Sequence, residues 1–386
     1  MTLCRLHCCD WGRLEEERSR IGALVEAGQF VLDPIGNIIL FDQPAKQMEF
    51  ARVWATQKYP ASPAPLWRGD VYRHDKIRIA YLSADYRTHA TALLMAGVFE
   101  AHDRSRFEIT AISFGADDKS PMRMRLEAGF DRFVDVRATA DAEVAKKLRE
   151  AEIDIAVDLK GYTQEGRPGI LAHRPAPIQA QYLGYPGTMA AGYYDYVIAD
   201  PIVIPEEHRA FFSEQVAYLP DTYQCNDSKR AIAPRAPRRA ELGLPEAGFV
   251  FCCFNNNHKI LAEMFDIWMR LLRQIDNSVL WLLQDNLAVV RNLSREAIAR
   301  GIAPERLVFA RRCMPADHLA RQRLADLFLD TLPYNAHTTC SDALWAGLPV
   351  LTMQGACFAG RVAASLLSAH GVPELIAHSL DEYEAM

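Results

Sequence analysis

The strongest constraint on the fold is an alternation of strand-like and helix-like segments that begins at Lys76. Buried strands are predicted for the apolar runs IRIAYLSADY, FEITAISFG, FVDV, IDIAVDLKG and YDYVIAD. Between them, helices are predicted for HATALLMAGVFEAHD, MRMRLEAG and DAEVAKKLREAE. Strands that alternate with helices in this way predict a parallel, doubly wound α/β sheet.

The alternation starts again in the last third of the chain. Strands are predicted for FVFCCFN, SVLWLLQ, RLVFA, LFLD and PVLTM, with helical segments such as KILAEMFDIWMRLLRQI and GRVAASLLSAHG between and after them. We therefore expect two Rossmann-like units that face a cleft. In such sheets, ligands bind at the carboxyl ends of the strands.

The 386-residue length also favours two domains. We expect a helical connector and Pro-rich linker at residues 1–70, with helices near residues 10–28 and 47–58, and a first Rossmann-like domain at residues 71–224. A linker at residues 225–240 leads to a second Rossmann-like domain at residues 241–386. The final segment, SLDEYEAM, begins a helix with Ser379 as N-cap and has no stop signal, so we expect this domain to be truncated.

Composition and charge exclude several classes of protein. The net charge is −6 and no run of Lys and Arg resembles a nucleic-acid-binding arm, so no nucleic-acid partner is expected. The nine cysteines form no C-x-x-C pair and no zinc-type spacing, which indicates reduced thiols. Neither a signal peptide nor a membrane-spanning run is visible. We expect a cytoplasmic protein with no membrane partner.

The segment NAHTTCSDALWAGLPV, residues 335–350, follows the predicted strand LFLD and supports two interpretations. Thr339 and Asp342 have the spacing of a capping box, which would only stabilise the start of a helix. A helix start at the carboxyl edge of a parallel sheet is also an anion site. There His337 and Thr338 would add donors, and Asp342 would accept from a ribose diol.

Two other positions also follow predicted strands. Lys259, in FNNNHKI, is either a solvated lysine at the start of a helix or a cation for a phosphate. His89, in YLSADYRTHAT, is either a structural loop histidine or a group that faces the cleft.

The run LGYPGT supports either a plain turn or a close approach of the backbone to a ligand. In the second case the loop that contacts the ligand consists of Gly184, Tyr185, Pro186, Gly187 and Thr188. The sequence has no D-x-D pair for a metal-bound nucleotide sugar, no G-x-x-x-x-G-K-[ST] loop and no G-x-G-x-x-G after a strand. We therefore expect an anion site made of protein donors, without metal or cofactor.

Several separated motifs occur in order from residue 77 to residue 386: YLSADYRTH, DLKGYT, RPAPIQAQYLGYPGT, FNNNHKI, NSVLWLL, LADLFLDTLPYNAHTTCSDALWAG and GRVAAS. In these motifs the chain resembles the catalytic region of the O-linked N-acetylglucosamine transferases, glycosyltransferase family 41, of the bacterial type that lacks the intervening domain. The resemblance implies a fold of the glycosyltransferase B type. It also implies metal-independent, inverting transfer of N-acetylglucosamine from UDP-GlcNAc to Ser or Thr hydroxyls of protein acceptors.

The resemblance also assigns roles to residues. It implies that His337, Thr338 and Thr339 hold the UDP pyrophosphate and that Asp342 holds the ribose. Lys259 would stabilise the leaving phosphate with Asn256 close by, and His318 would lie beside the uracil. His89 would lie on the acceptor side as a candidate general base.

The chain departs from the family pattern in ways that keep alternatives open. Asp154 and Leu93 stand where the animal enzymes have histidines, and no tetratricopeptide repeat is detectable, although residues 1–60 resemble the connector that follows such repeats. One alternative is a UDP-glucose-dependent N-glucosyltransferase that acts on Asn. The other is a truncated, inactive scaffold that binds protein partners.

Overall fold

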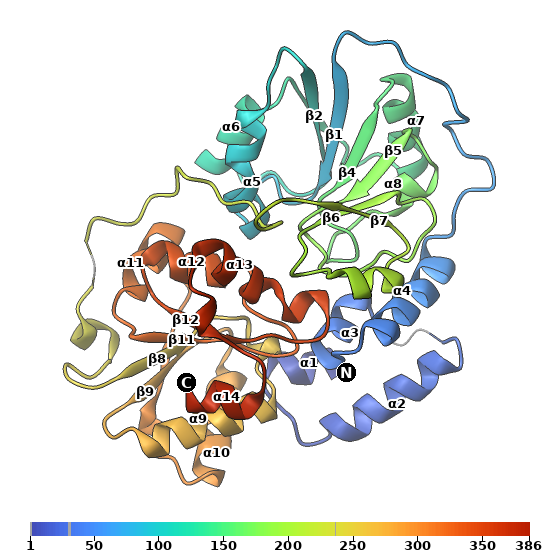
Figure 1. The fold of residues 1–386 in the computed structure, drawn as a ribbon. Coiled ribbons are helices and arrows are strands. Elements are labelled where there is room, and N and C mark those ends of the chain that lie inside the picture. Colours follow the sequence, from blue (N-terminus) through green and yellow to red (C-terminus); the bar gives the residue numbers. More distant parts are fainter. Residues whose placement is uncertain (1, 30–31, 236) are drawn as a thin grey trace. The chain divides into compact units, whose positions relative to one another are not determined.

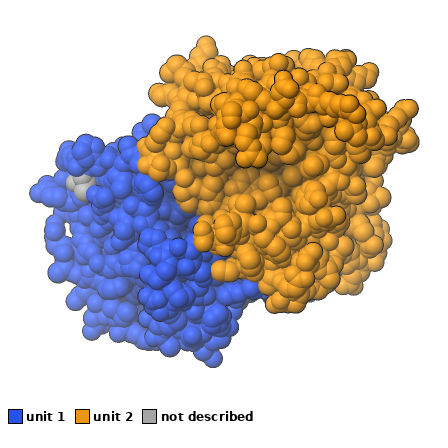
Figure 2. Space-filling view, turned by 45° about the horizontal axis from the view of Figure 1, so that its top comes forward, with its two compact units in different colours: residues 1–23, 230–386 blue, residues 24–229 orange. Residues whose placement is uncertain are grey.

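The computed structural model of the chain describes residues 2–29, 32–235 and 237–386. The chain forms two compact units, coloured separately in Figure 2. Unit 1 comprises residues 1–23 and 230–386, and unit 2 comprises residues 24–229. The boundary at residues 229 and 230 falls inside the linker expected at 225–240, whereas the expected 1–70 segment is shared between the two units.

In the described part of unit 2, seven parallel strands form one sheet in the order β3-β2-β1-β4-β5-β6-β7 (Figure 1). The strands are β1 (Ile77–Ser83), β2 (Phe107–Ser113), β3 (Arg132–Asp135), β4 (Ile155–Asp158), β5 (Ile178–Gln181), β6 (Tyr196–Ala199) and β7 (Gln215–Tyr218). The helices between them are α5 (Ala90–Ala101), α6 (Pro121–Ala128), α7 (Asp141–Glu150), α8 (Gly169–Ala172) and the 3₁₀ helix η1 (Glu206–Phe211). The order reverses between β1 and β4.

Unit 1 repeats this plan. Its described residues form a six-stranded parallel sheet in the order β10-β9-β8-β11-β12-β13 (Figure 1). The strands are β8 (Val250–Cys253), β9 (Val279–Leu283), β10 (Leu307–Ala310), β11 (Leu327–Leu329), β12 (Val350–Met353) and β13 (Ile376–Ala377). The helices are α9 (Ala262–Gln274), α10 (Leu287–Ala299), α11 (Pro315–Gln322), α12 (Thr338–Ala346), α13 (Val362–His370) and α14 (Leu380–Ala385). The described part of this unit also has five 3₁₀ helices: η2 (Arg239–Leu242), η3 (Asn257–Lys259), η4 (Pro304–Arg306), η5 (Phe358–Gly360) and η6 (Pro373–Leu375).

The strands form where apolar residues run unbroken, as a sheet covered on both faces requires. The last five residues of β1 and all four of β8 are buried. Between strands, α9 buries one apolar face that includes Phe265 and Trp268. The last helix begins as the sequence predicts, because the Ser379 hydroxyl accepts a hydrogen bond from the Glu382 N–H at 3.1 Å.

Within the described residues, four helices precede the first sheet: α1 (Thr2–His7), α2 (Leu14–Glu26), α3 (Pro34–Leu40) and α4 (Pro44–Lys58). In unit 1, the segment after α1 packs on η3. The Cys9 thiol donates to Asn257 O at 3.4 Å and the Trp11 indole donates to Ile260 O at 3.1 Å. The N-terminal segment thus supports the turn that holds Lys259.

The predicted Pro-rich linker before β1 is anchored within unit 2. Backbone N–H groups of Leu66 and Trp67 donate to the carbonyls of His173 and Arg174 at 2.9 and 2.8 Å.

No helix in the described ranges has both the length and the apolar character needed to cross a membrane.

Candidate functional site

Unit 1 places the candidate donor residues at its topological switch point. The strand order reverses between β8 and β11, and in open α/β sheets the crevice for ligands lies at the carboxyl ends of the strands on either side of such a reversal. The segment after β8 carries Asn255, Asn256 and Lys259, and the segment after β11 runs from Asp330 to the start of α12. Parallel pairing of β8 with β11 brings these two segments to the same edge.

Lys259 is buried at this edge. Its Nζ donates to the Asn335 carbonyl at 2.8 Å and lies 3.6 Å from the centroid of the Tyr334 ring. Burial lowers the pKa of Lys259 to about 7, while the nearby Asp330 carboxylate acts in the opposite direction. The interpretation as a solvated lysine at a helix start is therefore wrong, since the residue ends the 3₁₀ turn η3 and α9 begins only at Ala262.

Asp330 shapes the loop that leads to α12. Its Oδ1 accepts from the N–H groups of Thr331 and Ala336 at 2.7 and 2.6 Å, and its Oδ2 accepts from the Thr352 hydroxyl at 2.7 Å. Burial raises the pKa of Asp330 to about 6, against these hydrogen bonds and the charge of Lys259. The carboxylate therefore holds the loop closed and supplies the counter-charge for Lys259.

The capping box predicted at the start of α12 is wrong. The cap position is His337, and no side chain caps this helix in the described part of the chain. The Thr339 hydroxyl instead donates to Asn255 Oδ1, across the switch point. Asp342 Oδ1 lies 2.6 Å from Arg230 Nη2. Because neither side chain covers the first turn, its N–H groups and the positive end of the helix dipole face the sheet edge.

His337 is fixed in one tautomer. Its Nε2 lies 3.0 Å from the Ala359 carbonyl, which can only accept, so Nε2 carries the proton. Burial lowers the pKa of His337 well below its usual value, and Lys259 adds to the shift. In this neutral form Nδ1 has a lone pair, so donation to a phosphate from Nδ1 requires the doubly protonated ring.

His318 and Asn256 lie on different segments of unit 1. His318 is on α11, where its Nδ1 accepts from Arg321 Nε at 3.0 Å and its ring lies 5.1 Å from that of Phe254. Burial, followed by the charges of Arg321, Arg230 and Arg312, lowers the pKa of His318 to about 3. A neutral, flat ring of this kind can lie against a nucleobase. Asn256 is exposed, and its Oδ1 accepts from Arg312 Nη2 at 3.0 Å.

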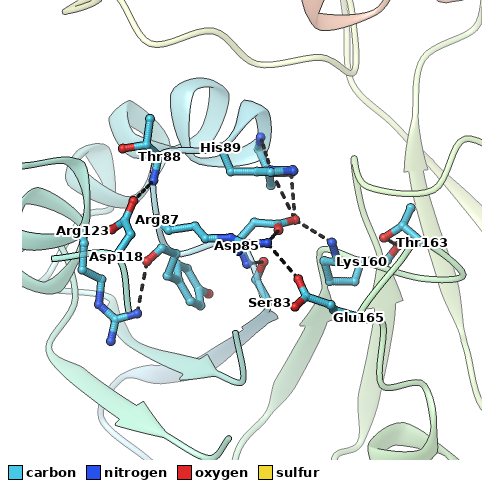
Figure 3. A network of polar contacts seen from close by, with 12 residues as sticks. Ser83, Asp85, Arg87, Thr88, His89, Asp118, Arg123, Lys160, Thr163 and Glu165 are labelled. Atoms are coloured by element: carbon cyan, nitrogen blue, oxygen red, sulfur yellow. Dashed lines mark hydrogen bonds and ion pairs between the residues drawn. The ribbon is translucent and has the colours of Figure 1, made fainter. Parts of the chain in front are cut away.

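Unit 2 has a second polar cluster at its own switch point, between β1 and β4 (Figure 3). Asp85, which is 2% exposed, holds Lys160 Nζ at 2.7 Å from its Oδ2. The same oxygen lies 3.4 Å from His89 Nδ1. His89 is the N-cap of α5, where Nδ1 accepts from the Thr91 N–H at 3.2 Å. Burial lowers the pKa of His89, and Asp85 opposes this shift.

The loop of residues 183–188 packs against the end of β4 in the same unit. Leu183 has a positive φ of 69°, and a Cβ at Gly184 would clash with the Leu159 carbonyl, so the glycine is required there by close packing. The Thr188 hydroxyl and the Met189 N–H both donate to the buried Glu214 at 2.6 Å. Tyr185 is buried, and the Gly187 N–H donates to its carbonyl at 3.1 Å across Pro186.

A family model described as glycosyl transferase family 41 matches residues 63–238 and 235–386, which is most of the chain. The chain belongs to glycosyl transferase family 41. The resemblance seen in the sequence motifs is thereby confirmed.

Named relatives agree with family 41 membership. A protein of Arabidopsis thaliana named probable UDP-N-acetylglucosamine–peptide N-acetylglucosaminyltransferase SEC is 38% identical over 315 residues, which cover 80% of this chain and 32% of the relative. The UDP-N-acetylglucosamine–peptide N-acetylglucosaminyltransferase of Caenorhabditis elegans is 28% identical over 428 residues, 82% of this chain and 37% of that protein. The chain thus spans about a third of the length of these two relatives.

A solved structure supports the same family 41 fold. A lysine-to-methionine mutant of the Thermobaculum terrenum O-GlcNAc transferase superposes with a TM-score of 0.80 and 32% identity, over 89% of this chain and 65% of that one. The predicted fold class, two Rossmann-like units of the glycosyltransferase B type preceded by helices, is confirmed.

Several polar residues at the two switch points of this family 41 chain are not among those predicted from the sequence. They are Asn255, Asp330 and Arg230 in unit 1 and Asp85 and Lys160 in unit 2. A usable signal existed for four of them, because each lies within three residues of the carboxyl end of a predicted strand. In the described ranges, no group of three or more His, Cys, Asp or Glu side chains is arranged to hold a metal ion.

Proposed function

We propose that the chain is the catalytic region of an inverting glycosyltransferase that moves N-acetylglucosamine from UDP-GlcNAc to Ser or Thr hydroxyls of proteins. The observation that carries the proposal is Lys259, a buried lysine held at the switch point of unit 1, beside the uncapped start of α12. The names of the family 41 relatives, which specify UDP-N-acetylglucosamine and a peptide, supply the substrate class.

In this proposal unit 1 binds the donor. The diphosphate would lie at the first turn of α12, whose N–H groups attract anions. Thr338 would donate to the diphosphate from its hydroxyl, and Thr339 would do so once its hydroxyl turns from Asn255 Oδ1 to the phosphate. His337 would line the site, and Asn256 would lie beside the diphosphate. His318 would lie beside the uracil, and Asp342 would accept from the ribose hydroxyls.

The chemical step needs one base and one cation. The acceptor oxygen attacks the anomeric carbon, the bond from that carbon to the β-phosphate oxygen breaks, and the oxygen leaves with the electron pair. The Lys259 ammonium would stabilise the negative charge that develops there, as preorganised donors do in a dry site. We propose that this protein cation makes a metal or other cofactor unnecessary.

Unit 2 would supply the acceptor side. The hydroxyl proton must go to a base, and His89 can accept it at Nε2 only when its proton is on Nδ1. Asp85 Oδ2, 3.4 Å from Nδ1, would stabilise that tautomer, whereas the Thr91 N–H stabilises the other one. The loop carrying Gly184, Tyr185 and Thr188 would line the acceptor path beside Lys160.

We propose a cytoplasmic location and no nucleic-acid partner. All nine cysteines lie in the described ranges and none is in a disulfide, which is typical of a reducing compartment. The net charge of −6 offers no general attraction for a polyanion.

Transfer to a peptide tests the proposed function. A peptide that contains both Ser/Thr and Asn is incubated with the protein and either UDP-GlcNAc or UDP-glucose, and its intact mass is measured. We expect addition of one N-acetylhexosamine, located on a hydroxyl by fragmentation, and loss of transfer in His89→Ala with UDP binding unchanged. Addition of a hexose to Asn, or UDP binding without any transfer, would contradict the proposal.

A further inference from the structure

The Arg230 side chain is buried against helix α12, which carries Asp342, the proposed ribose-binding carboxylate. Its side chain is 5% exposed, and its Nη2 lies 2.6 Å from Asp342 Oδ1. The Trp345 indole, one turn further along α12, donates to the Arg230 carbonyl at 3.3 Å. Both the backbone and the guanidinium of Arg230 are therefore fixed against one face of α12.

The residues after Arg230 lead to helix α11, which carries His318, the residue proposed to lie beside the uracil. The Ala233 N–H donates to the Ala316 carbonyl at 3.0 Å, two residues before His318 on α11. The Arg230 charge also contributes to the lowered pKa of His318, so the guanidinium lies near that ring. The segment 230–233 thus runs from the proposed ribose residue to the proposed uracil residue.

One nitrogen of the guanidinium has no partner among the described residues. Arg230 Nη1 is buried and makes no hydrogen bond to any residue in the described part of the chain. A buried donor left unpaired is costly, so Nη1 calls for an acceptor such as an ordered water or a bound ligand. A guanidinium offers only donors, and the complementary groups on a nucleoside are ribose and carbonyl oxygens.

We propose that Arg230 is a nucleoside-binding residue: Nη2 orients the Asp342 carboxylate for the ribose diol, and Nη1 donates to an oxygen of the same nucleoside. This inference rests on the proposed binding of UDP to unit 1. It assigns a donor-recognition role to the linker between the two units, which the motif resemblance leaves without one.

Calorimetric titration with two probes tests the inference. UDP carries the nucleoside, and inorganic pyrophosphate carries only the diphosphate. Arg230→Met keeps the aliphatic length, and we expect it to weaken UDP binding about 10- to 100-fold, the range for a lost hydrogen bond with a charged partner. Pyrophosphate binding should not change. Arg235→Met, at a side chain that is 84% exposed on the same linker, is the matched control and should bind UDP as the wild type does.

The outcomes separate this inference from the proposed function. Wild-type protein that fails to bind UDP contradicts the proposed function itself. Normal UDP binding by Arg230→Met, or equal weakening of UDP and pyrophosphate, overturns only the role of Arg230.

Arg230→Lys provides the second variant if Arg230→Met does not fold. It keeps the charge beside Asp342 but removes the forked donors, so a selective loss of UDP affinity is still expected. Unchanged UDP affinity in Arg230→Lys would also overturn the inference. If 2′-deoxy-UDP shows no further loss in the variants, Nη1 contacts the ribose 2′ oxygen; the same loss as in the wild type places the contact on another oxygen of the nucleoside.

Discussion

Lys259→Met is expected to lower the transfer rate about 10²- to 10³-fold, the usual loss when one preorganised donor to a developing negative charge is removed. The methionine keeps the length of the stem beside Tyr334 but cannot carry charge. Turnover of the peptide substrate at saturating UDP-GlcNAc measures the effect. Lys146→Met, at an exposed lysine of unit 2, is the matched control and should retain wild-type turnover.

The same variant should change the pH dependence of stability. Burial lowers the pKa of Lys259 to about 7, so between about pH 7 and pH 10 the unfolded chain binds more protons at this residue than the folded chain does. The wild-type free energy of unfolding should therefore rise with pH across that window, and the contribution should be absent in Lys259→Met. Turnover within threefold of wild type, or identical pH profiles, would contradict a buried catalytic cation.

Asp85→Ala and Lys160→Met should each destabilise unit 2 by about 3–5 kcal/mol, because each leaves a buried charge without its partner. The double variant should recover part of this loss, since it leaves neither charge. Urea denaturation gives the free energies of unfolding, and hydrogen exchange in β1 and β4 assigns the change to unit 2.

A surface ion pair is the control for this buried one. Arg137 Nη2 lies 2.7 Å from Asp135 Oδ2, and the two side chains are 46% and 40% exposed. Arg137→Met should therefore change the free energy of unfolding by less than about 1 kcal/mol. If the single buried variants cost no more than this control, or the double variant costs the sum of the two, the pair does not have the stabilising role that its burial suggests.

The predictable part of the fold is the part encoded in long apolar runs. The sequence predicts strands such as β1 and β9 because each is a continuous run of mostly apolar residues. It predicts helices such as α9 because the helical spacing of apolar residues continues over several turns. The sequence does not predict β5, β7 or the two-residue strand β13. β5 is only four residues long, and it buries Gln179 and Gln181, whose amides donate to backbone carbonyls inside the unit. A short, polar, buried strand has no apolar pattern to detect.

The site was predictable at the level of segments and not of contacts. The strand order places Lys259 and the start of α12 at one sheet edge, and the positions of both follow from the sequence. The hydrogen-bond partners of these residues cannot be predicted from the sequence, because they are distant along the chain. Thr339 bonds to Asn255, which is 84 residues away, and Lys259 bonds to Asn335, which is 76 residues away. The capping-box prediction failed because α12 begins at Thr338, so His337 is the cap position and Thr339 lies inside the first turn, where its hydroxyl donates to Asn255.

Calorimetric titration of UDP across pH 7–9 tests the central claim, that Lys259 at the switch point of unit 1 binds the diphosphate. Above a pKa of about 7 the free lysine is mostly neutral, so binding a diphosphate must take up a proton. The phosphate of UDP ionises near pH 6 and does not titrate in this window. Wild-type affinity should fall by up to about tenfold per pH unit with uptake of up to one proton, and Lys259→Met should bind weakly with no pH dependence. Binding by the wild type that does not change with pH, or the same curve in both proteins, would contradict the claim.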